Sequence, residues 1–257
     1  MMSSTLWIGY RTILRKEVTR IFRIWPQTIL PSVMTQFLYF LIFGSLIGSQ
    51  ISGFGQGGYA AFLVPGLIMM SAITNAFSNT ASSFFGAKFS RSIEELLVSP
   101  LKSWTILAGY VSGGVVRSLL VAVAVFLVSL LFAPLHISHL FVLLFFLFMT
   151  CLIFSLLGFL NGLFAQKFDD VSIIPTFVLT PLTYLGGVFY SLDRLPAVWR
   201  VISYGNPIVY MIDGFRYGFS GVSSTSVVLS GSLLVGVAIL LLSVCLYLMK
   251  KGMGLKT

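Results

Sequence analysis

A cluster of charged side chains at residues 88–104 is the densest group of chemically active residues in this sequence. The stretch reads KFSRSIEELLVSPLKSW, and it holds five charges in a chain that is only 9% charged: Lys88, Arg91, Glu94, Glu95 and Lys102. Arg91 precedes the two glutamates by three and four residues, the spacing of ion pairs on one helix face. Ser92 and Glu95 fit the S-x-x-E pattern of a capping box. These patterns predict a short helix stabilised by its own polar residues.

The predicted helix, residues 90–100, also has an apolar face. Ile93, Leu96 and Leu97 fall on one side of it. Pro100 stops the helix, because the residue before a proline avoids the helical region. A plain connecting loop has no need for such a face. We therefore expect the helix to bind either the membrane surface or a protein partner, and the residues alone leave both alternatives open.

Further polar residues lie beside or inside apolar runs. Asp169 and Asp170, in AQKFDDVSIIP, are predicted to cap the following helix or to form a second docking point. Arg117 is a charge inside an apolar run, so we expect an ion pair within the bundle, a polar lining or a contact between subunits. Asn75 and Asn79 belong to a polar stripe that serves either helix packing or a permeation surface.

The segment before the last apolar run is too apolar for a solvated loop and too short to span a membrane twice. Gly205 is predicted to end a first helix, and Asn206 with Pro207 is a good start for a second. Gly218 is predicted to end that second helix. Residues 195–218 therefore indicate two short re-entrant or interfacial helices.

Two opposite charges lie in the second of these short helices. Asp213 and Arg216 are three residues apart, which favours a local ion pair. The alternative is that they act with Asn206 and Pro207 as an outer gate through which substrate leaves.

Nucleotide-binding and hydrolytic motifs are absent from the sequence. It contains no G-x-x-x-x-G-K-[ST], G-x-S-x-G or H-E-x-x-H. His136 and His139 are too few ligands for a metal site. Cys151 and Cys245 lie in apolar runs, which predicts buried free thiols. We expect no catalytic residue, no metal and no cofactor held by this chain, which is therefore not expected to be an enzyme.

Long apolar helices must position these residues. The chain has 257 residues, of which 57% are hydrophobic, whereas soluble domains average about 45–50% apolar residues. Its mean hydropathy is +0.99. Apolar runs of about 20 residues predict an all-α integral membrane fold with six spans. The predicted spans are 28–48, 60–86, 105–133, 139–165, 171–190 and 227–249. Residues 1–257 are thus expected to form a single transmembrane domain.

Basic residues are distributed unevenly around these spans. On the predicted topology, 12 Lys and Arg lie on the side of the two termini and 3 on the other side. An excess of Lys and Arg marks the cytoplasm, so both termini are predicted to be cytoplasmic. The net charge of +9 then reflects orientation rather than nucleic-acid binding. Residues 5–24 mix helically spaced apolar residues with arginines, which indicates an amphipathic interface helix or a simple orientation signal.

Four segments resemble one family of membrane proteins. They read FLVPGLIMMSAITNAF (62–77), SFFGAKFSRSIEELLVSPLKSW (83–104), PTFVLTPLTYLGGVFYSLDRLP (175–196) and YGNPIVYMIDGFRYG (204–218), and the last two are the most specific. Through them, over nearly its whole length, the chain resembles the type-2 ABC transporter permeases, the inner-membrane subunits of bacterial exporters. Within that family it is similar to the small six-span group of nodulation-factor, daunorubicin and YadH-like exporters.

The resemblance implies a role for each short element. Such permeases have a cytoplasmic interface helix, a coupling helix that docks a separate ATPase, and two short helices before the sixth span, and residues 5–24, 90–100 and 195–218 match them in order. The coupling helix is therefore expected to press its apolar residues into an ATPase groove, with its charges at the rim. The residues implied in ATPase coupling are Arg91, Ile93, Glu94, Glu95, Leu96, Leu97, Asp169 and Asp170.

These observations predict the permease subunit of an ATP-binding cassette exporter of the bacterial inner membrane. The resemblance further implies ATP and Mg on two copies of a partner ATPase, and a homodimer of this chain among membrane lipids. An ion-gradient-driven secondary transporter is the alternative, and such transporters often bury acids at mid-membrane. All seven acids are predicted to lie in loops or interfacial segments, which argues against it. A structural or lipid-interacting membrane protein is a third hypothesis. No motif specifies the substrate.

Overall fold

A computed structural model describes residues 2–48, 58–192 and 195–254, and the elements in these ranges are helical. The helices of the first part of the chain are α1 (Met2–Arg23), α2 (Trp25–Thr28), α3 (Leu30–Tyr39), η1 (Phe40–Ile47) and α4 (Gly58–Phe89). The later helices are α5 (Ser92–Val98), α6 (Ser103–Ser129), α7 (Leu140–Phe164), α8 (Phe168–Ile174), η3 (Pro175–Leu179), α9 (Thr180–Tyr184), α10 (Ala197–Tyr204), α11 (Pro207–Ser220) and α12 (Val227–Lys251). Most of the predicted connection 49–59, together with Arg194 and Lys256, lies outside the described residues.

Five continuous helical stretches in the described chain are long and apolar enough to cross a membrane. They are Trp25–Ile47, Gly58–Phe89, Ser103–Ser129, Leu140–Phe164 and Val227–Lys251. Each coincides with a predicted span, although α4 extends beyond the prediction at both ends. The all-helical membrane fold predicted from the sequence is confirmed.

The remaining predicted span, 171–190, is a shorter and interrupted stretch made of α8, η3 and α9. Pro175 and Pro181 interrupt the regular ladder because proline has no N–H to donate. The chain widens to a π-helical turn at this point, and the Thr180 hydroxyl donates to the Pro175 carbonyl at 2.9 Å. Residues 168–184 rise only about 25 Å, less than the roughly 30 Å of a bilayer core. A count of six full spans is therefore not confirmed.

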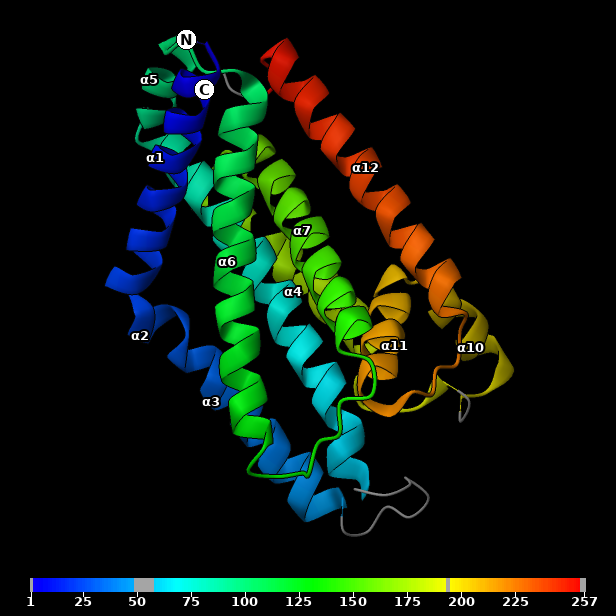
Figure 1. Cartoon of the computed structure of the whole chain (residues 1–257). Coiled ribbons are helices and arrows are strands. Elements are labelled where there is room, and N and C mark those ends of the chain that lie inside the picture. The colour runs from blue at the N-terminus through cyan, green and yellow to red at the C-terminus, as the bar shows by residue number, and fades with distance from the viewer. Residues whose placement is uncertain (1, 49–57, 193–194, 255–257) are drawn as a thin grey trace.

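The centre of the bundle is α4, which packs between α6 and α7 (Figure 1). Glycines allow the helices to approach closely, because no side chain separates the two backbones. A Cβ at Gly162 would lie 2.8 Å from the Ala81 carbonyl oxygen, and one at Gly158 would overlap the Phe77 carbonyl. Gly158 and Gly162 are four residues apart, the spacing of small residues that is typical of closely packed membrane helices.

The first helix, α1, lies lengthwise beside the first half of α6, and the two run in the same direction (Figure 1). A Cβ at Gly109 would lie 2.8 Å from the Ile13 Cβ, and one at Gly113 would lie 2.7 Å from the Glu17 Cβ. The contacting residues are four positions apart on both helices, which keeps these contacts on one face of each helix. The sequence predicts the helix but not this docking against the bundle.

The two ends of the described chain lie at the same end of the molecule as α5, as Figure 1 shows. The connection between α6 and α7 lies at the opposite end. The pair α10 and α11 lies beside α7 and α12, on the far side of the bundle from α1. The short elements are thus held at defined places by the long helices.

Replacing Gly158 with alanine is predicted to destabilise the protein. The added methyl group would overlap the backbone of α4, and overpacking of this kind costs about 1–3 kcal/mol. Gly236→Ala on α12 is the matched control, because nothing lies within 4 Å of a Cβ there. Thermal unfolding of the purified protein should show a lower midpoint for Gly158→Ala alone. Equal shifts in the two variants would contradict the close α4–α7 contact.

Candidate functional site

The short helix α5 follows α4 after a tight turn, and that turn determines how it begins. Arg91 adopts a left-handed backbone with φ 58°, which redirects the chain within two residues. Ser92 is the first helical residue rather than the cap, and its hydroxyl donates to the Ala87 carbonyl at 3.2 Å. The capping box predicted from Ser92 and Glu95 is therefore wrong. In this part of the structure, Arg91 also forms no ion pair with Glu94 or Glu95.

The apolar face of α5 is divided between the bundle and the surface. Ile93 is 1% exposed and belongs to the core, and Leu96 packs against that core. Leu97 is partly exposed and Val98 is 88% exposed. Ile93 consequently anchors α5 to its own chain, which corrects its predicted place in a partner's groove. The outward surface of α5 comprises Arg91, Glu94, Glu95, Leu97 and Val98.

Two contacts tie the base of α5 to neighbouring helices. Lys88, the residue one turn before α5, is buried and its Nζ donates to the Leu163 and Ala165 carbonyls at 2.8 and 2.9 Å. It satisfies carbonyls that the end of α7 leaves without helical partners. Phe89 and Phe168 stack edge to face with ring centres 4.9 Å apart, which joins α4 to α8. The sequence analysis names Lys88 as one of five charges but assigns it no contact, because its partners lie 75 and 77 residues away.

Asp170 caps α8, as one of the two predicted alternatives states. Its Oδ2 accepts hydrogen bonds from the backbone N–H groups of Gln166 and Lys167 at 2.8 and 3.0 Å. These two hydrogen bonds, with the larger effect from the Gln166 N–H, hold the pKa of the Asp170 carboxyl below its ordinary value. Asp169 is exposed beside it. Of the two acids, Asp169 is therefore the one free to meet a partner.

The first of the two short helices before α12 ends at Gly205 as predicted, and the second begins as predicted. Asn206 Oδ1 accepts from the Ile208 N–H at 3.0 Å and its Nδ2 donates to the Leu182 carbonyl at 2.6 Å, with Pro207 as the first helical residue. The predicted end is wrong, since α11 continues to Ser220 and Gly221 ends it with φ 69°. Gly218 instead lets α11 approach α7, because a Cβ there would lie 2.6 Å from the Leu143 Cβ.

The predicted ion pair between Asp213 and Arg216 is absent from the described structure. Asp213 accepts from the Thr225 N–H at 2.9 Å and from the Thr225 hydroxyl at 2.7 Å, which fixes the approach to α12. Arg216 donates to the Gly187 carbonyl at 3.0 Å and lies 4.0 Å from the centre of the Phe62 ring. Each residue thus holds a different segment in place.

Arg117 lies in a polar cluster between α1, α4 and α6. Its Nη1 donates to Asn79 Oδ1 at 3.3 Å, and Arg20 Nη2 donates to the same oxygen at 2.8 Å. Arg20 also forms an ion pair with Glu17 at 2.9 Å, and Glu17 is fully buried. Glu17 is the functional candidate that the sequence analysis missed, because it lies in the predicted interface helix and yet is fully buried against the bundle. Glu17 lies four residues from both Ile13 and Ile21, and this helical spacing is the signal in the sequence that indicates the buried face.

Asn75 lies one turn before Asn79 on α4. Its Nδ2 donates to the Ser32 hydroxyl at 3.0 Å and to the Ser71 carbonyl at 2.9 Å. Asn75 is 4% exposed. In the structure, this part of the stripe therefore holds α3 against α4.

A bundle of long apolar helices with a short helix at one end and a pair of short helices at its side is typical of a multi-pass membrane protein. The family model described as "ABC-2 type transporter" matches residues 9–220. The chain belongs to this family, whose permeases generally partner with an ABC ATPase.

Three relatives illustrate the likeness. The chain is 53% identical to "Inner membrane transport permease YadH" of Escherichia coli (strain K12) over 257 residues, 100% of both chains. It is 26% identical to "Nodulation protein J" of Rhizobium leguminosarum bv. viciae over 197 residues, 75% of this chain and 76% of the relative. It is also 26% identical to "Putative transport permease ycf38" of Cyanophora paradoxa, over 76% of this chain and 69% of the relative. The chain is therefore similar, over its whole length, to a protein named as an inner membrane transport permease.

Asp170→Asn is predicted to loosen the start of α8. The neutral amide is a weaker acceptor than the carboxylate, so the amides of Gln166 and Lys167 should exchange hydrogen faster. Asp169→Asn, at the exposed neighbour, should leave this exchange unchanged. Because the pKa of Asp170 is lowered in the folded protein, the protection is complete above about pH 4 and is lost as the pH falls below that value. Hydrogen exchange followed by mass spectrometry checks the effect of the substitutions and the effect of pH. Equal exchange in Asp170→Asn and Asp169→Asn would argue against the cap.

Proposed function

We propose that this chain is the permease subunit of an ATP-driven exporter. In this proposal both termini and α5 lie in the cytoplasm, and α5 receives the partner ATPase. The observation that carries the proposal is the outward surface of α5, where two acids adjoin exposed apolar side chains at the end of the molecule that holds both termini (Figure 1). Membership of the ABC-2 family supports an ATPase as the occupant of that surface.

The packing below α5 explains how movement there would reach the membrane helices. Ile93 fixes α5 to the core, and Lys88 joins the end of α4 to the end of α7. A push on α5 would therefore displace α4 and α7 together, since packed helices move as rigid bodies. ATP with Mg on two partner ATPases supplies the free energy, and two copies of the permease form the pathway by which substrate leaves the cytoplasm.

The second candidate is a secondary transporter driven by an ion gradient, and the buried Glu17 is the observation that favours it. Glu17 is nevertheless paired with Arg20 and accepts the Ser83 hydroxyl at 2.7 Å. Both carboxylate oxygens of Glu17 are thus already engaged by partners within the protein. Transport by this chain alone, with an ion gradient and without ATPase or ATP, would support the second candidate.

Charge reversal on α5 is predicted to weaken ATPase binding. Glu94→Lys/Glu95→Lys should lower the affinity for the partner ATPase by about tenfold or more, because like charges at an interface oppose association. Lys250→Glu, an exposed charge change at the end of α12, should bind the ATPase as the unchanged protein does. The measurement is binding of purified ATPase to permease in nanodiscs, followed by ATP-dependent transport. Unchanged affinity and transport in the double variant would refute the docking role of α5.

A further inference from the structure

The polar cluster between α1, α4 and α6 contains more positive charge than it can neutralise. Arg20 and Arg117 are two cations, and Glu17, the acid of this cluster among the described residues, pairs with Arg20. The Glu17 carboxylate is already used, because Oε2 accepts from Arg20 at 2.9 Å and Oε1 accepts from the Ser83 hydroxyl at 2.7 Å. Arg117 is left with neutral acceptors: Asn79 Oδ1 at 3.3 Å and the Thr28 carbonyl at 3.4 Å.

The cluster also contains donors without acceptors. Nε of Arg20, Nε of Arg117 and Nδ2 of Asn79 are buried and make no hydrogen bond in the described structure. Asn79 is 1% exposed, and its single carbonyl oxygen is shared by both guanidinium groups. Buried donors are normally satisfied, and the two long bonds of Arg117 are weak. Three side chains of the cluster thus retain unpaired donors, and the described residues supply no second anion to them.

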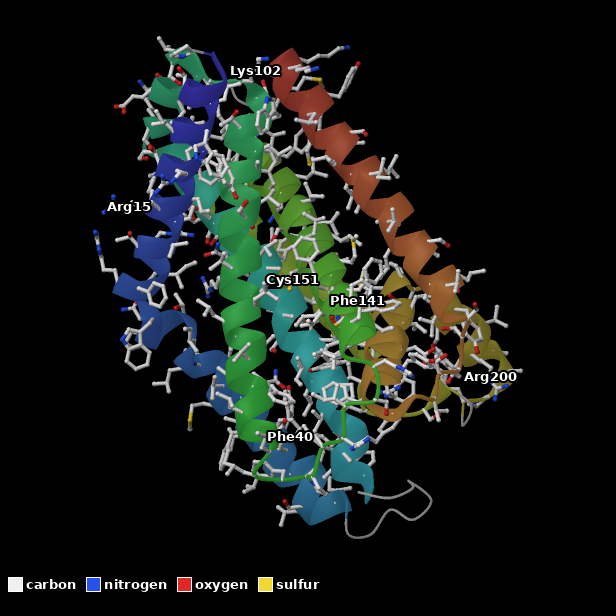
Figure 2. All side chains as sticks on the ribbon, in the orientation of Figure 1. Arg15, Phe40, Lys102, Phe141, Cys151 and Arg200 are labelled. Carbon is white, nitrogen blue, oxygen red and sulfur yellow. The ribbon has the colours of Figure 1, made fainter. Side chains whose placement is uncertain are left out.

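This region is reachable from the side of α1. The Arg20 side chain is 32% exposed, and Arg117 is partly exposed. Four further cations, Arg11, Arg15, Lys16 and Arg23, are exposed along α1, and Figure 2 shows Arg15 pointing away from the bundle. A basic helix at the edge of a membrane bundle attracts anionic headgroups, and basic pockets between membrane helices bind them.

We propose that Arg20, Arg117 and Asn79 form a binding site for an oxyanion, of the kind carried by the phosphate of an anionic phospholipid. Planar guanidinium groups bind phosphate through two parallel hydrogen bonds, and the two arginines here come from different helices. The bound phosphate supplies the missing negative charge and holds α1 against α4 and α6. The site is independent of the proposed transport function and of the ATPase. Its phosphate comes either from a lipid headgroup or from free phosphate.

Lipid titration of the intact purified protein tests the site. Native mass spectrometry with added phosphatidylglycerol should show at least one bound lipid whose affinity falls roughly 10- to 100-fold in Arg117→Gln, as expected for the loss of hydrogen bonds to a charged group. Arg15→Gln is the matched control, because it removes an exposed charge from α1 outside the cluster. Phosphatidylcholine and inorganic phosphate form the comparison arms. Equal affinity of Arg117→Gln and the unchanged protein for phosphatidylglycerol would overturn the proposal.

Thermal unfolding in the same arms separates binding from folding. In phosphatidylcholine, Arg117→Gln should unfold at the same temperature as the unchanged protein or higher, since it removes an uncompensated charge. Phosphatidylglycerol should raise the unfolding temperature of the unchanged protein and of Arg15→Gln only. Stabilisation by inorganic phosphate to the same extent would assign the site to a free oxyanion, and no response in either arm would refute it. If Arg117→Gln does not fold, Arg117→Lys decides: unchanged lipid affinity in that variant contradicts the site.

Discussion

The buried ion pair between Glu17 and Arg20 is the interaction on which the rest of the structure depends. Glu17 is fully buried opposite Gly113, where only a glycine leaves space for its side chain. An unpaired carboxylate in this position would be strongly destabilising, so the pair fixes both the rotation and the depth of α1. Arg20 in turn reaches Asn79 on α4, which also accepts a hydrogen bond from Arg117. Three helices are thereby held by one polar cluster inside an apolar bundle.

The same central helix connects this cluster to the proposed site of energy input. Asn79 and Lys88 both lie on α4, and Lys88 binds the end of α7 while α5 continues the chain. Glycines bring α7 against α4 without intervening side chains. The polar cluster, the short helix and the central helices therefore form one mechanical unit. The two ends of this unit have different proposed ligands: α5 binds a protein partner, and the cluster at Arg117 binds an anionic group.

Local patterns predicted the parts of the structure that depend on neighbours in sequence. The start of α11 at Asn206 and the cap at Asp170 each depend on hydrogen bonds to residues a few positions away. Residue type was therefore enough to predict both. Ser92 failed as a cap because the turn at Arg91 depends on where α4 ends. The burial of Glu17 was not predicted, because it depends on a glycine of α6 that is distant in sequence. The predicted span 171–190 is not confirmed as a full span, because hydropathy registers neither the π-helical turn at Pro175 nor the end of the helix at Tyr184.

Disulfide formation in native membranes tests most directly whether α1 lies against α6. Cysteines replace Ile13 and Gly109 in a chain with Cys151 and Cys245 changed to alanine. The two Cβ positions are 2.8 Å apart, so an outward shift of α1 by about 1 Å brings them to the roughly 3.8 Å of a disulfide. Thr12→Cys with Gly109→Cys is the control, because Thr12 is exposed one residue away. The account predicts rapid and nearly complete crosslinking for the first pair and little for the control, since a disulfide needs a short distance between Cβ atoms. Equal or absent crosslinking in both pairs would contradict the docking of α1 on which the cluster depends.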